Sequence, residues 1–253
     1  MDSRPVVLVT GAARRIGRCI AFELAAHGWD VAVHCHASVA DAQHTAALLR
    51  EQGATAEVFV ADLSHEAGCN ALVPRVAAHF GRIDAVVNNA SLFEHDDVAS
   101  FSMAAMERHW RSNTAPPVLL ARALAAQGAG VVVNLLDQKL WNLNPDHFSY
   151  TLSKAALQAA TTMLALALAP RVRVCSVAPG VTLVSGTMDE GEFEAAHQMT
   201  PLQRSSTPDD VARAVRFLLE SPAITGTTLL VDGGQHLQAQ PRDVMFLARE
   251  GKD

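Results

Sequence analysis

Short runs of apolar, mostly β-branched residues recur along the chain and alternate with longer segments that have a helical period. Most of these runs are apolar on both faces, as is typical of strands in a parallel sheet covered on both sides. They predict strands at residues 6–10, 31–35, 56–61, 85–89, 131–136, 172–177 and 227–232. The intervening segments predict helices at residues 15–27, 39–52, 66–80, 103–126, 150–169 and 208–220.

The alternation of strands and helices predicts an α/β protein with a doubly wound Rossmann fold, in which helices flank a seven-stranded parallel sheet. The chain contains no internal repeat, linker or low-complexity tract, so residues 1–253 are expected to form a single domain. The helix at 208–220 has a clear start, with Thr207 as N-cap and Pro208 at the first position. The helix at 150–169 is apolar nearly all round, so its outer face is a candidate subunit contact.

Composition and charge narrow the range of partners. The chain has 253 residues, 49% of them hydrophobic, and a formal net charge of −6 without a run of like charges. We therefore expect neither a nucleic-acid nor a membrane partner. The amino-terminal segment enters a strand almost at once, so a signal peptide is not expected. Four scattered cysteines are typical of reduced thiols, and a cytoplasmic location is expected.

The tripeptide at residues 34–36, His-Cys-His, raises the question of a metal site. On a strand, His34 and His36 share one face while Cys35 points to the other. This arrangement does not match the usual spacing of zinc ligands, and we expect no metal.

A phosphate-binding turn is expected where the first strand ends. The segment TGAARRIG, residues 10–17, leads from that strand into a helix. Gly11 permits a tight turn, and Gly17 lets the helix pack close to the strand. The start of the helix offers free N–H groups and the positive end of the helix dipole to a phosphate. Its place after the first strand of a βαβ unit favours a nucleotide site over a plain tight turn.

Nearly the whole chain, up to about residue 237, resembles the short-chain dehydrogenase/reductase family. The matching segments are TGAARRIG, ADL at 61–63, NNAS at 88–91, RSNTA around Asn113, YTLSK at 150–154, APG at 178–180 and ITGTTLLVDGG at 224–234. The resemblance implies a nicotinamide cofactor and an active site of Asn113, Tyr150 and Lys154. It also implies a homotetramer, since the family commonly forms tetramers. The cofactor contacts that it implies include Asp62 near the adenine and Asn89 and Ala90 beside a ribose. The other implied contacts are Gly11, Arg14, Arg15, Ile16, Gly17, His36, Ser38, Leu63, Lys154, Pro179, Gly180 and Thr182.

Tyr150 is the only tyrosine of the chain and precedes Lys154 by one helical turn. A free phenol has a pKa of about 10, which is too high for efficient proton transfer near pH 7. The charge of Lys154, with that of an oxidised nicotinamide, is expected to favour the phenolate and lower the pKa of Tyr150. Lys154 can also hold the hydroxyls of the nicotinamide ribose. Such a pair occurs often by chance, and here the surrounding motifs decide for a catalytic role.

Two departures from the common family pattern concern Arg15 and Asp137. Arg15 replaces the second glycine of the turn, and Asp137 replaces a serine that hydrogen-bonds a substrate carbonyl. Both replacements occur together in the pteridine reductase branch, and Phe93 in NNASLF stands where that branch places an aromatic ring on the pterin. The segment PLQRS at 201–205 resembles the end of its substrate loop. The resemblance implies a pterin-like small-molecule substrate bound by Arg15, Ser91, Phe93, Asp137 and Tyr150.

The chemistry of a pterin is consistent with these residues. A pterin is flat and polar and has no exposed ketone, so Phe93 on one face and nicotinamide on the other would enclose it. Reduction of a ring C=N bond requires a hydride at carbon and a proton at nitrogen. Asp137 beside Tyr150 can relay that proton, whereas a serine cannot readily do so. Arg15 can pair with a cofactor phosphate and with the polar edge of the substrate. Random change at the glycine and serine positions is the open alternative.

The end of the second strand predicts NADPH as the preferred cofactor. An NAD enzyme usually carries an acid there for the ribose 2′-hydroxyl. This chain has no acid before Asp41. Arg14 stands where NADP-using relatives carry a base, and Ser38 can donate a hydrogen bond to a phosphate. The branch often shows an arginine where Ala37 stands, so a weaker grip on the phosphate is expected.

Two segments after the last catalytic motif are also interpreted. Residues 181–207 are polar and glycine-punctuated and include a predicted helix at 189–199, so we expect a substrate lid, with an ordinary surface insertion as the alternative. The C-terminal tail, 235–253, contains four consecutive apolar residues from Val244. Such a run seldom stays in water, and we predict that residues 242–248 are buried against a neighbouring subunit. Packing on the tail's own subunit is the alternative. The histidines His95, His147 and His197 are expected at the surface or rim and not as catalysts.

The favoured function is NADPH-dependent reduction of a pterin ring C=N bond, on a dihydropteridine or dihydrofolate type of substrate. Two alternatives stay open: an NADPH-dependent reductase of small carbonyl or quinone compounds, and a catalytically weak NADP-binding regulatory protein. Oxidation of NADPH in the presence of a dihydropterin separates the first two functions. Cofactor binding without turnover favours the third.

Overall fold

The computed structural model describes residues 4–184 and 188–250 of the chain. Seven strands form one parallel sheet in the order β3-β2-β1-β4-β5-β6-β7. Their bounds are β1 Val6–Val9, β2 Asp30–Cys35, β3 Ala56–Val60, β4 Ala85–Asn88, β5 Gly130–Leu135, β6 Val172–Pro179 and β7 Thr228–Val231. The predicted doubly wound sheet is confirmed, and every strand end lies within two residues of its expected position.

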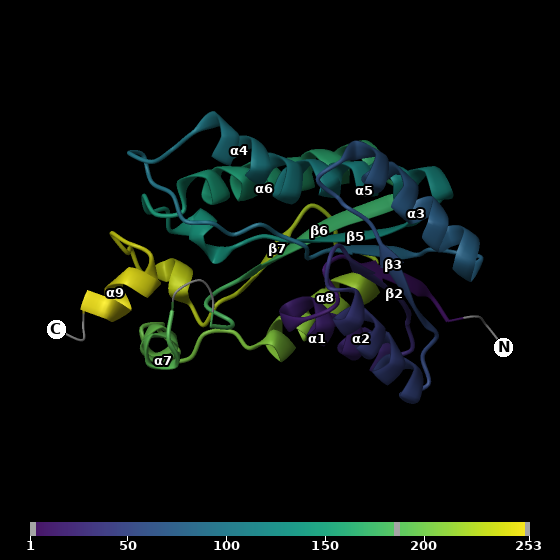
Figure 1. Ribbon diagram of the computed structural model, residues 1–253, viewed down its shortest axis with the longest axis horizontal. Coiled ribbons are helices and arrows are strands. Elements are labelled where there is room, and N and C mark those ends of the chain that lie inside the picture. Colours follow the sequence, from purple (N-terminus) through teal and green to yellow (C-terminus); the bar gives the residue numbers. More distant parts are fainter. Residues whose placement is uncertain (1–3, 185–187, 251–253) are drawn as a thin grey trace.

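Helices cover both faces of the sheet, and two more lie beyond its end (Figure 1). The α-helices are α1 Arg15–Ala26, α2 Val39–Glu51, α3 Glu66–Phe80, α4 Met103–His109, α5 Ala115–Gln127, α6 Phe148–Leu168, α7 Glu190–Gln198, α8 Pro208–Glu220 and α9 Val244–Glu250. Three shorter helical segments are η1 Trp110–Thr114, η2 Gln138–Trp141 and η3 Gln235–Leu237. No helix in the described parts of the chain combines the length and the apolar character needed to cross a bilayer.

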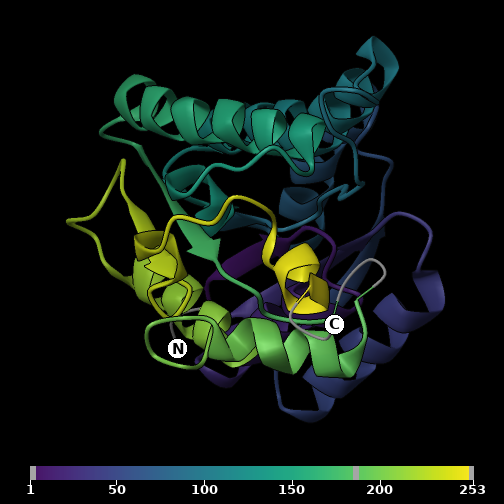
Figure 2. The same ribbon diagram turned by 90° about the vertical axis from the view of Figure 1, so that its left-hand side faces the viewer.

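Alternation along the strands divides the core into two layers. Val7 and Val9 pack with residues of α1, α2 and α8 on one face, and Leu8 packs with residues of α3 and α5 on the other. Because successive strand residues point to opposite faces, an uninterrupted apolar strand contributes to both layers. Figure 1 shows α1, α2 and α8 below the sheet and α3, α4, α5 and α6 above it. Helices α7 and α9 lie together at one end, and α9 faces the viewer in Figure 2.

The predicted helix at 103–126 is wrong as one element, because it is divided into α4, the π-helical turn η1 and α5. Pro116 and Pro117 follow the turn within the first residues of α5. Neither proline has an N–H group to continue the hydrogen bonds of α4, so the ladder is interrupted before them. Asn113 lies within the π-helical turn. The predicted start of α8 is confirmed, since the Thr207 side chain accepts from Asp210 N and the Asp210 side chain accepts from Thr207 N.

The turn between β1 and α1 depends on a very close approach of two glycines. Gly11 has φ +65°, a left-handed conformation that favours glycine. A Cβ atom on Gly17 would lie 2.3 Å from the carbonyl oxygen of Gly11, so no larger residue fits without movement of the backbone. These two positions bring the first turn of α1 against the end of β1. The start of α1 is thereby placed beside the point between β1 and β4 where the strand order reverses, the usual ligand position in such folds.

A buried histidine, His34 on β2, is hydrogen-bonded to this turn. Its Nδ1 accepts a hydrogen bond from Gly11 N at 3.1 Å, and its Nε2 lies 3.1 Å from the carbonyl oxygen of Ala61. A carbonyl only accepts, so the proton of the neutral ring is on Nε2. Burial is the main cause that lowers the pKa of His34 to about 4. The neutral ring therefore links the glycine turn to the end of β3, and its protonation would remove the acceptor for Gly11.

This arrangement predicts a loss of stability in mild acid. His34 has a normal pKa of about 6.5 in the unfolded chain and about 4 in the folded protein, so below pH 6.5 the unfolded state takes up the proton first. We expect wild type to lose roughly 3 kcal/mol of unfolding free energy from this residue between pH 6.5 and 4. His34→Asn should be less stable at pH 7 and should lack this loss. Urea unfolding as a function of pH measures the difference.

The exposed His44 on α2 provides the control for this measurement. His44→Asn should follow the wild-type curve at every pH. If the unfolding free energies of His34→Asn and wild type fell in parallel with decreasing pH, His34 would not be the cause of the loss of stability in acid.

Candidate active site

A cavity of about 640 Å³ opens at the carboxyl ends of the central strands, between the start of α1, α6 and the C-terminal residues. Most of the expected site residues line it. These are Gly11, Arg14, Arg15, Ile16, Gly17, His36, Ser38, Asn89, Ala90, Ser91, Phe93, Asp137, Tyr150, Lys154, Pro179, Gly180 and Thr182. Within the described residues, Asp62, Leu63 and Asn113 are the three expected positions that lie outside its lining.

The glycine turn is braced by the segment that follows β4. Asn89 Nδ2 donates to the carbonyl oxygens of Thr10 at 2.9 Å and Gly11 at 3.3 Å. Thr10 Oγ1 in turn accepts from the backbone N–H groups of Asn89 and Ala90. Arg14, the N-cap of α1, makes no side-chain cap bond within the described residues, so the first N–H groups of this helix remain available. A helix start of this kind, with glycine at positions 11 and 17 and no side-chain cap, fits the phosphates of a dinucleotide.

Arg14 and Ser38 come together at the end of β2. Arg14 Nη2 donates to Ser38 Oγ at 2.9 Å, and the same guanidinium forms an ion pair with Asp41 at 2.7 Å. Both partners of the ion pair are about half exposed, so the pair is a weak one that an incoming phosphate can displace. The sequence therefore located two groups suited to a 2′-phosphate, but it did not anticipate that Asp41 binds the same arginine.

Thr182 and Asp62 are two further expected cofactor positions. Thr182 is buried, and its hydroxyl bonds to Gly180 O and Ser206 Oγ. The Asp62 carboxylate accepts from the backbone and hydroxyl of Ser64, which lower its pKa. Asp62 Oδ2 is also 3.8 Å from His36 Nε2, so Asp62 lies next to a residue that lines the cavity.

Arg15 lies between the glycine turn and the lid. It adopts a left-handed backbone conformation with φ +54°, and its guanidinium donates to the carbonyl oxygen of Val184 at 2.9 Å. Residues 185–187 of the expected lid, like 1–3 and 251–253 of the expected domain, lie outside the described residues. The predicted helix in the lid is confirmed as α7, which begins with a capping box between Asp189 and Glu192.

Asn113 holds neighbouring segments, and the hydrogen bonds that the structure describes for it do not include Tyr150. Its side chain bonds to both backbone groups of Leu92, to Ser91 Oγ and to Ser153 Oγ. These bonds tie the loop that carries Phe93 to helix α6. Asn113 therefore supports the site from outside the cavity.

Helix α6 presents Tyr150 and Lys154 to the cavity, and its start is fixed from a distant loop. His147, the residue before the helix, has φ +54° and provides no cap through its side chain. The buried Asp96 carboxylate instead accepts from Ser149 N at 2.9 Å and from Ser149 Oγ. A carboxylate at a helix N-terminus satisfies free N–H groups and interacts favourably with the helix dipole.

Tyr150 and Asp137 form a direct hydrogen bond at the centre of the cavity. Tyr150 Oη donates to Asp137 Oδ2 at 2.9 Å, and Asp137 Oδ1 accepts from Lys139 N at 2.9 Å. Burial, and then the negative charge of Asp137, raise the pKa of Tyr150 well above its usual value. Burial also raises the pKa of Asp137, although the bonds from Lys139 N and Tyr150 lower it in part. Both raised pKa values favour the protonated forms of these two groups.

The expectation that Lys154 lowers the pKa of Tyr150 is wrong for the protein by itself. Lys154 Nζ donates to the carbonyl oxygen of Leu135 at 2.7 Å and lies 5.8 Å from the centre of the Tyr150 ring. Burial lowers the pKa of Lys154 to about 8, against a smaller opposite effect of Asp137. The nearby carboxylate of Asp137 and the loss of water outweigh the ammonium at this distance.

Phe93 stands over the pair from the loop after β4. Its ring makes an edge contact with Tyr150, with ring centres 4.7 Å apart, and stacks on His147 at 4.2 Å. It is 40% exposed, so one side of the ring is available to a flat ligand. His147 is buried, and its Nδ1 lies 3.2 Å from the carbonyl oxygen of Glu94. The interpretation of His147 as a surface residue is wrong, because the ring packs between Phe93 and His95.

The C-terminal tail packs on its own subunit, and the predicted burial of residues 242–248 against a neighbour is corrected. Val244, Met245 and Ala248 of α9 are buried together with Met188 and with Ala196 of the lid helix. Arg249 forms an ion pair with Glu192 of α7 at 2.9 Å. The apolar run was correctly expected to be buried, but the lid of the same chain covers it.

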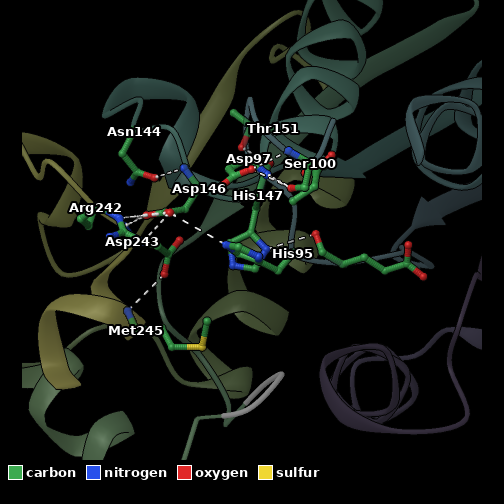
Figure 3. Close-up of polar contacts among 12 residues, drawn as sticks. His95, Asp97, Ser100, Asn144, Asp146, His147, Thr151, Arg242, Asp243 and Met245 are labelled. Atoms are coloured by element: carbon green, nitrogen blue, oxygen red, sulfur yellow. Dashed lines mark hydrogen bonds and ion pairs between the residues drawn. The ribbon is translucent and has the colours of Figure 1, made fainter. Parts of the chain in front are cut away.

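Several cavity residues were missed by the sequence analysis. They are Lys139 and His147 in the loop before α6, and Asp243, Val244 and Met245 in the tail. A lysine two positions after Asp137 was the one local signal, since a charged residue beside a catalytic carboxylate influences its pKa. The tail residues carried no signal for this position, because contacts more than 90 residues apart in sequence bring them here (Figure 3).

Comparisons with known proteins agree with this geometry. Residues 11–236 match the family described as enoyl-(acyl carrier protein) reductase. The crystal structure of FolM alternative dihydrofolate reductase 1 from Brucella canis, complexed with NADP, is 42% identical with a TM-score of 0.88, over 94% of this chain and 96% of that one. Pteridine reductase 1 of Leishmania tarentolae is 34% identical over 280 residues, which cover 92% of this chain and 96% of the relative. A putative ketoacyl reductase 2 of the granaticin polyketide synthase from Streptomyces violaceoruber is 37% identical over 248 residues, with the same coverage.

Proposed function

The chain belongs to the short-chain dehydrogenase/reductase family of oxidoreductases, and we propose that it catalyses the NADPH-dependent reduction of a pterin ring C=N bond. The dihydropteridine or dihydrofolate type is the proposed substrate class. The observation that carries this proposal is the 2.9 Å hydrogen bond between Tyr150 and Asp137 beneath the exposed ring of Phe93. A carbonyl reductase has no need of a carboxylate in that place, whereas protonation of a ring nitrogen does.

The names of the relatives point in the same direction. Pteridine reductase 1 and the FolM alternative dihydrofolate reductase are similar over almost the whole chain. The second of these was solved with NADP, which supports NADPH as the cofactor here. The phosphate fit of the α1 start and the Arg14–Ser38 pair support the same assignment from this chain's own residues.

The protein residues divide the work of proton delivery. Bound NADPH supplies a hydride to the ring carbon. Asp137 gives a proton to the adjacent ring nitrogen. The proton of Tyr150 Oη then passes along its hydrogen bond to the Asp137 carboxylate. The ammonium of Lys154 stabilises the phenolate that forms. Phe93 holds the flat ring of the substrate, and the apolar residues Val244 and Met245 exclude water from that end of the cavity.

A carbonyl reductase is the second candidate function. The ketoacyl reductase among the relatives favours it, and the Tyr150–Lys154 pair is suited to protonating a carbonyl oxygen. Loss of NADPH absorbance with a panel of dihydropterins, dihydrofolate and small ketones separates the two functions. Turnover of ketones alone would contradict the pterin proposal.

We also propose a homotetramer in the cytoplasm. The outer face of α6 exposes Leu152, Met163 and Leu166, which form an apolar surface of the kind that subunit contacts cover. Light scattering should give the mass of four chains at micromolar concentration. A mass of one chain would contradict the assembly.

The proton path gives a first test of the function. Tyr150→Phe should lower kcat on a dihydropterin by about 10² or more, the usual size of a lost general acid, because Asp137 can no longer be reprotonated. NADPH affinity should stay within about twofold of wild type, since the phenol ring is retained. Steady-state kinetics and fluorescence titration measure the two quantities.

The aspartate gives a second, more specific variant on the same path. Asp137→Ser restores the residue of the common family pattern and should impair pterin reduction more than any reduction of ketones. Equal activity of Asp137→Ser and wild type on a dihydropterin would exclude the proton relay through Asp137.

Cofactor preference is tested at Arg14. Arg14→Ala should weaken NADPH by about 1.5–3 kcal/mol, the cost of one charged hydrogen bond, and should leave NADH almost unchanged. Asp41→Asn is the matched variant, because it frees Arg14 from its ion pair and should bind NADPH at least as tightly as wild type. Fluorescence titration with both cofactors gives the affinities. An equal loss for NADPH and NADH in Arg14→Ala would place the 2′-phosphate elsewhere.

A further inference from the structure

The segment between Asp137 and α6, residues 138–147, lies directly against the C-terminal segment, residues 238–249. We call the first the catalytic loop and the second the C-terminal arm. One contact is made by Asn142, whose side chain donates to Gln238 O and accepts from Gln240 N at 3.1 Å. The catalytic loop is therefore held by a part of the chain about 100 residues further on.

A second contact is centred on Asp146, which is 3% exposed (Figure 3). Its carboxylate accepts from Arg242 Nε and Nη2, each at 2.9 Å, and from Asp243 N at 2.7 Å. His95 Nε2 lies 3.9 Å from the same carboxylate. A bidentate arginine and a backbone N–H fix both oxygens, so the arm has a defined register on the loop.

The third contact joins the arm to the reacting carboxylate. Lys139 is 3% exposed, and its Nζ donates to Asp146 O at 2.6 Å and to Asp243 Oδ2 at 3.1 Å. Its backbone N is the donor that holds Asp137 Oδ1 at 2.9 Å. A buried ammonium requires a negative partner, and Asp243 on the arm is the carboxylate that provides it. Asp243 is itself oriented by Met245 N, which donates to its other oxygen.

We propose that Asp243 is a positioning residue of the reaction: from the C-terminal arm it fixes Lys139, and Lys139 holds the Asp137 carboxylate toward Tyr150. The inference rests on the proposed proton delivery through Asp137. It adds the arm to the active site, although no residue of the arm gives or takes the transferred proton.

The charges around the two carboxylates make this proposal testable. Tyr150, Lys154, Lys139 and Asp243 face Asp137 from α6, from the loop and from the arm. The charge of Asp243 raises the pKa of Asp137, and the charge of Lys139 lowers it, beside the larger effect of burial.

The groups facing Asp243 come from both sides. Lys139 and the backbone of Met245 bond to it, and Asp146, Arg242 and His147 lie next to it. Removal of Asp243 or of Lys139 thus changes the field at Asp137 in opposite directions. A role in packing alone produces no such opposition.

The experiment compares Asp243→Asn and Lys139→Met in the full-length protein. The pH profile of kcat/KM on a dihydropterin should move to lower pH by about 0.5–1 unit in Asp243→Asn and to higher pH by a similar amount in Lys139→Met. We expect kcat to fall by about tenfold in both, the effect of a misplaced proton donor. NADPH affinity, from fluorescence titration, should stay within about twofold.

Asp97→Asn is the matched control, since Asp97 is a partly exposed aspartate that bonds to Ser100 (Figure 3). It removes the same charge and should leave the profile in place. The double variant Lys139→Met/Asp243→Asn leaves no buried charge unpaired, so it should recover most of the thermal stability while kcat stays low. A shift of both single variants in the same direction, or unchanged profiles in an active enzyme, would overturn the proposal.

A last measurement separates this proposal from the proposed function. If wild type reduces no pterin, the function fails, and hydrogen exchange of residues 138–142 with NADPH bound then decides the role of the arm. Asp243→Asn should exchange at least about tenfold faster there than Asp97→Asn. Equal exchange would show that Asp243 does not hold the loop.

Discussion

A charged side chain that is buried away from water needs a hydrogen-bonding or oppositely charged partner. This requirement determines how the segments around Asp137 are arranged. Lys154 is satisfied by a carbonyl of β5, and Lys139 by a carbonyl and the carboxylate of Asp243. Asp146 takes two bonds from Arg242. The partners come from β5, from the loop before α6 and from the C-terminal segment. The loop, the catalytic helix and the C-terminal residues are thereby held in one arrangement around Asp137.

Different kinds of chemical group line the two ends of the cavity. Around the glycine turn, backbone groups and small polar side chains dominate, and four hydrogen bonds join Thr10 and Gly11 to Asn89 and Ala90. These groups carry little charge of their own. At the substrate end, ionisable side chains lie beneath an aromatic ring, and burial pushes the pKa values of Asp137 and Tyr150 upward. A glycine turn held by hydrogen bonds and a buried pair of ionisable side chains thus line one cavity.

The sequence predicted those features that depend on neighbouring residues. The strands follow from short apolar runs, the cap at Thr207 from its own first turn, and the turn at Gly11 from a local pattern. The break before Pro116 was within reach of the same reasoning, since prolines cannot continue a hydrogen-bonded ladder. It was missed because the apolar periodicity runs on through it.

Other features depend on distant residues, and for those the local patterns were insufficient. Asp96 caps α6 from 53 residues away, and Asp243 meets Lys139 from 104 residues away. For the protein by itself, the pKa of Tyr150 is raised where Lys154 was expected to lower it, because depth of burial is a property of the folded molecule. The hydrogen bonds from Asn89 to the glycine turn also affect the order in which the site can form. The bond to Thr10 spans 79 residues, so the nucleotide-binding turn cannot reach its final shape while only the first two strands have emerged from a ribosome. The binding site that begins the sequence is completed only after the fourth strand has joined the sheet.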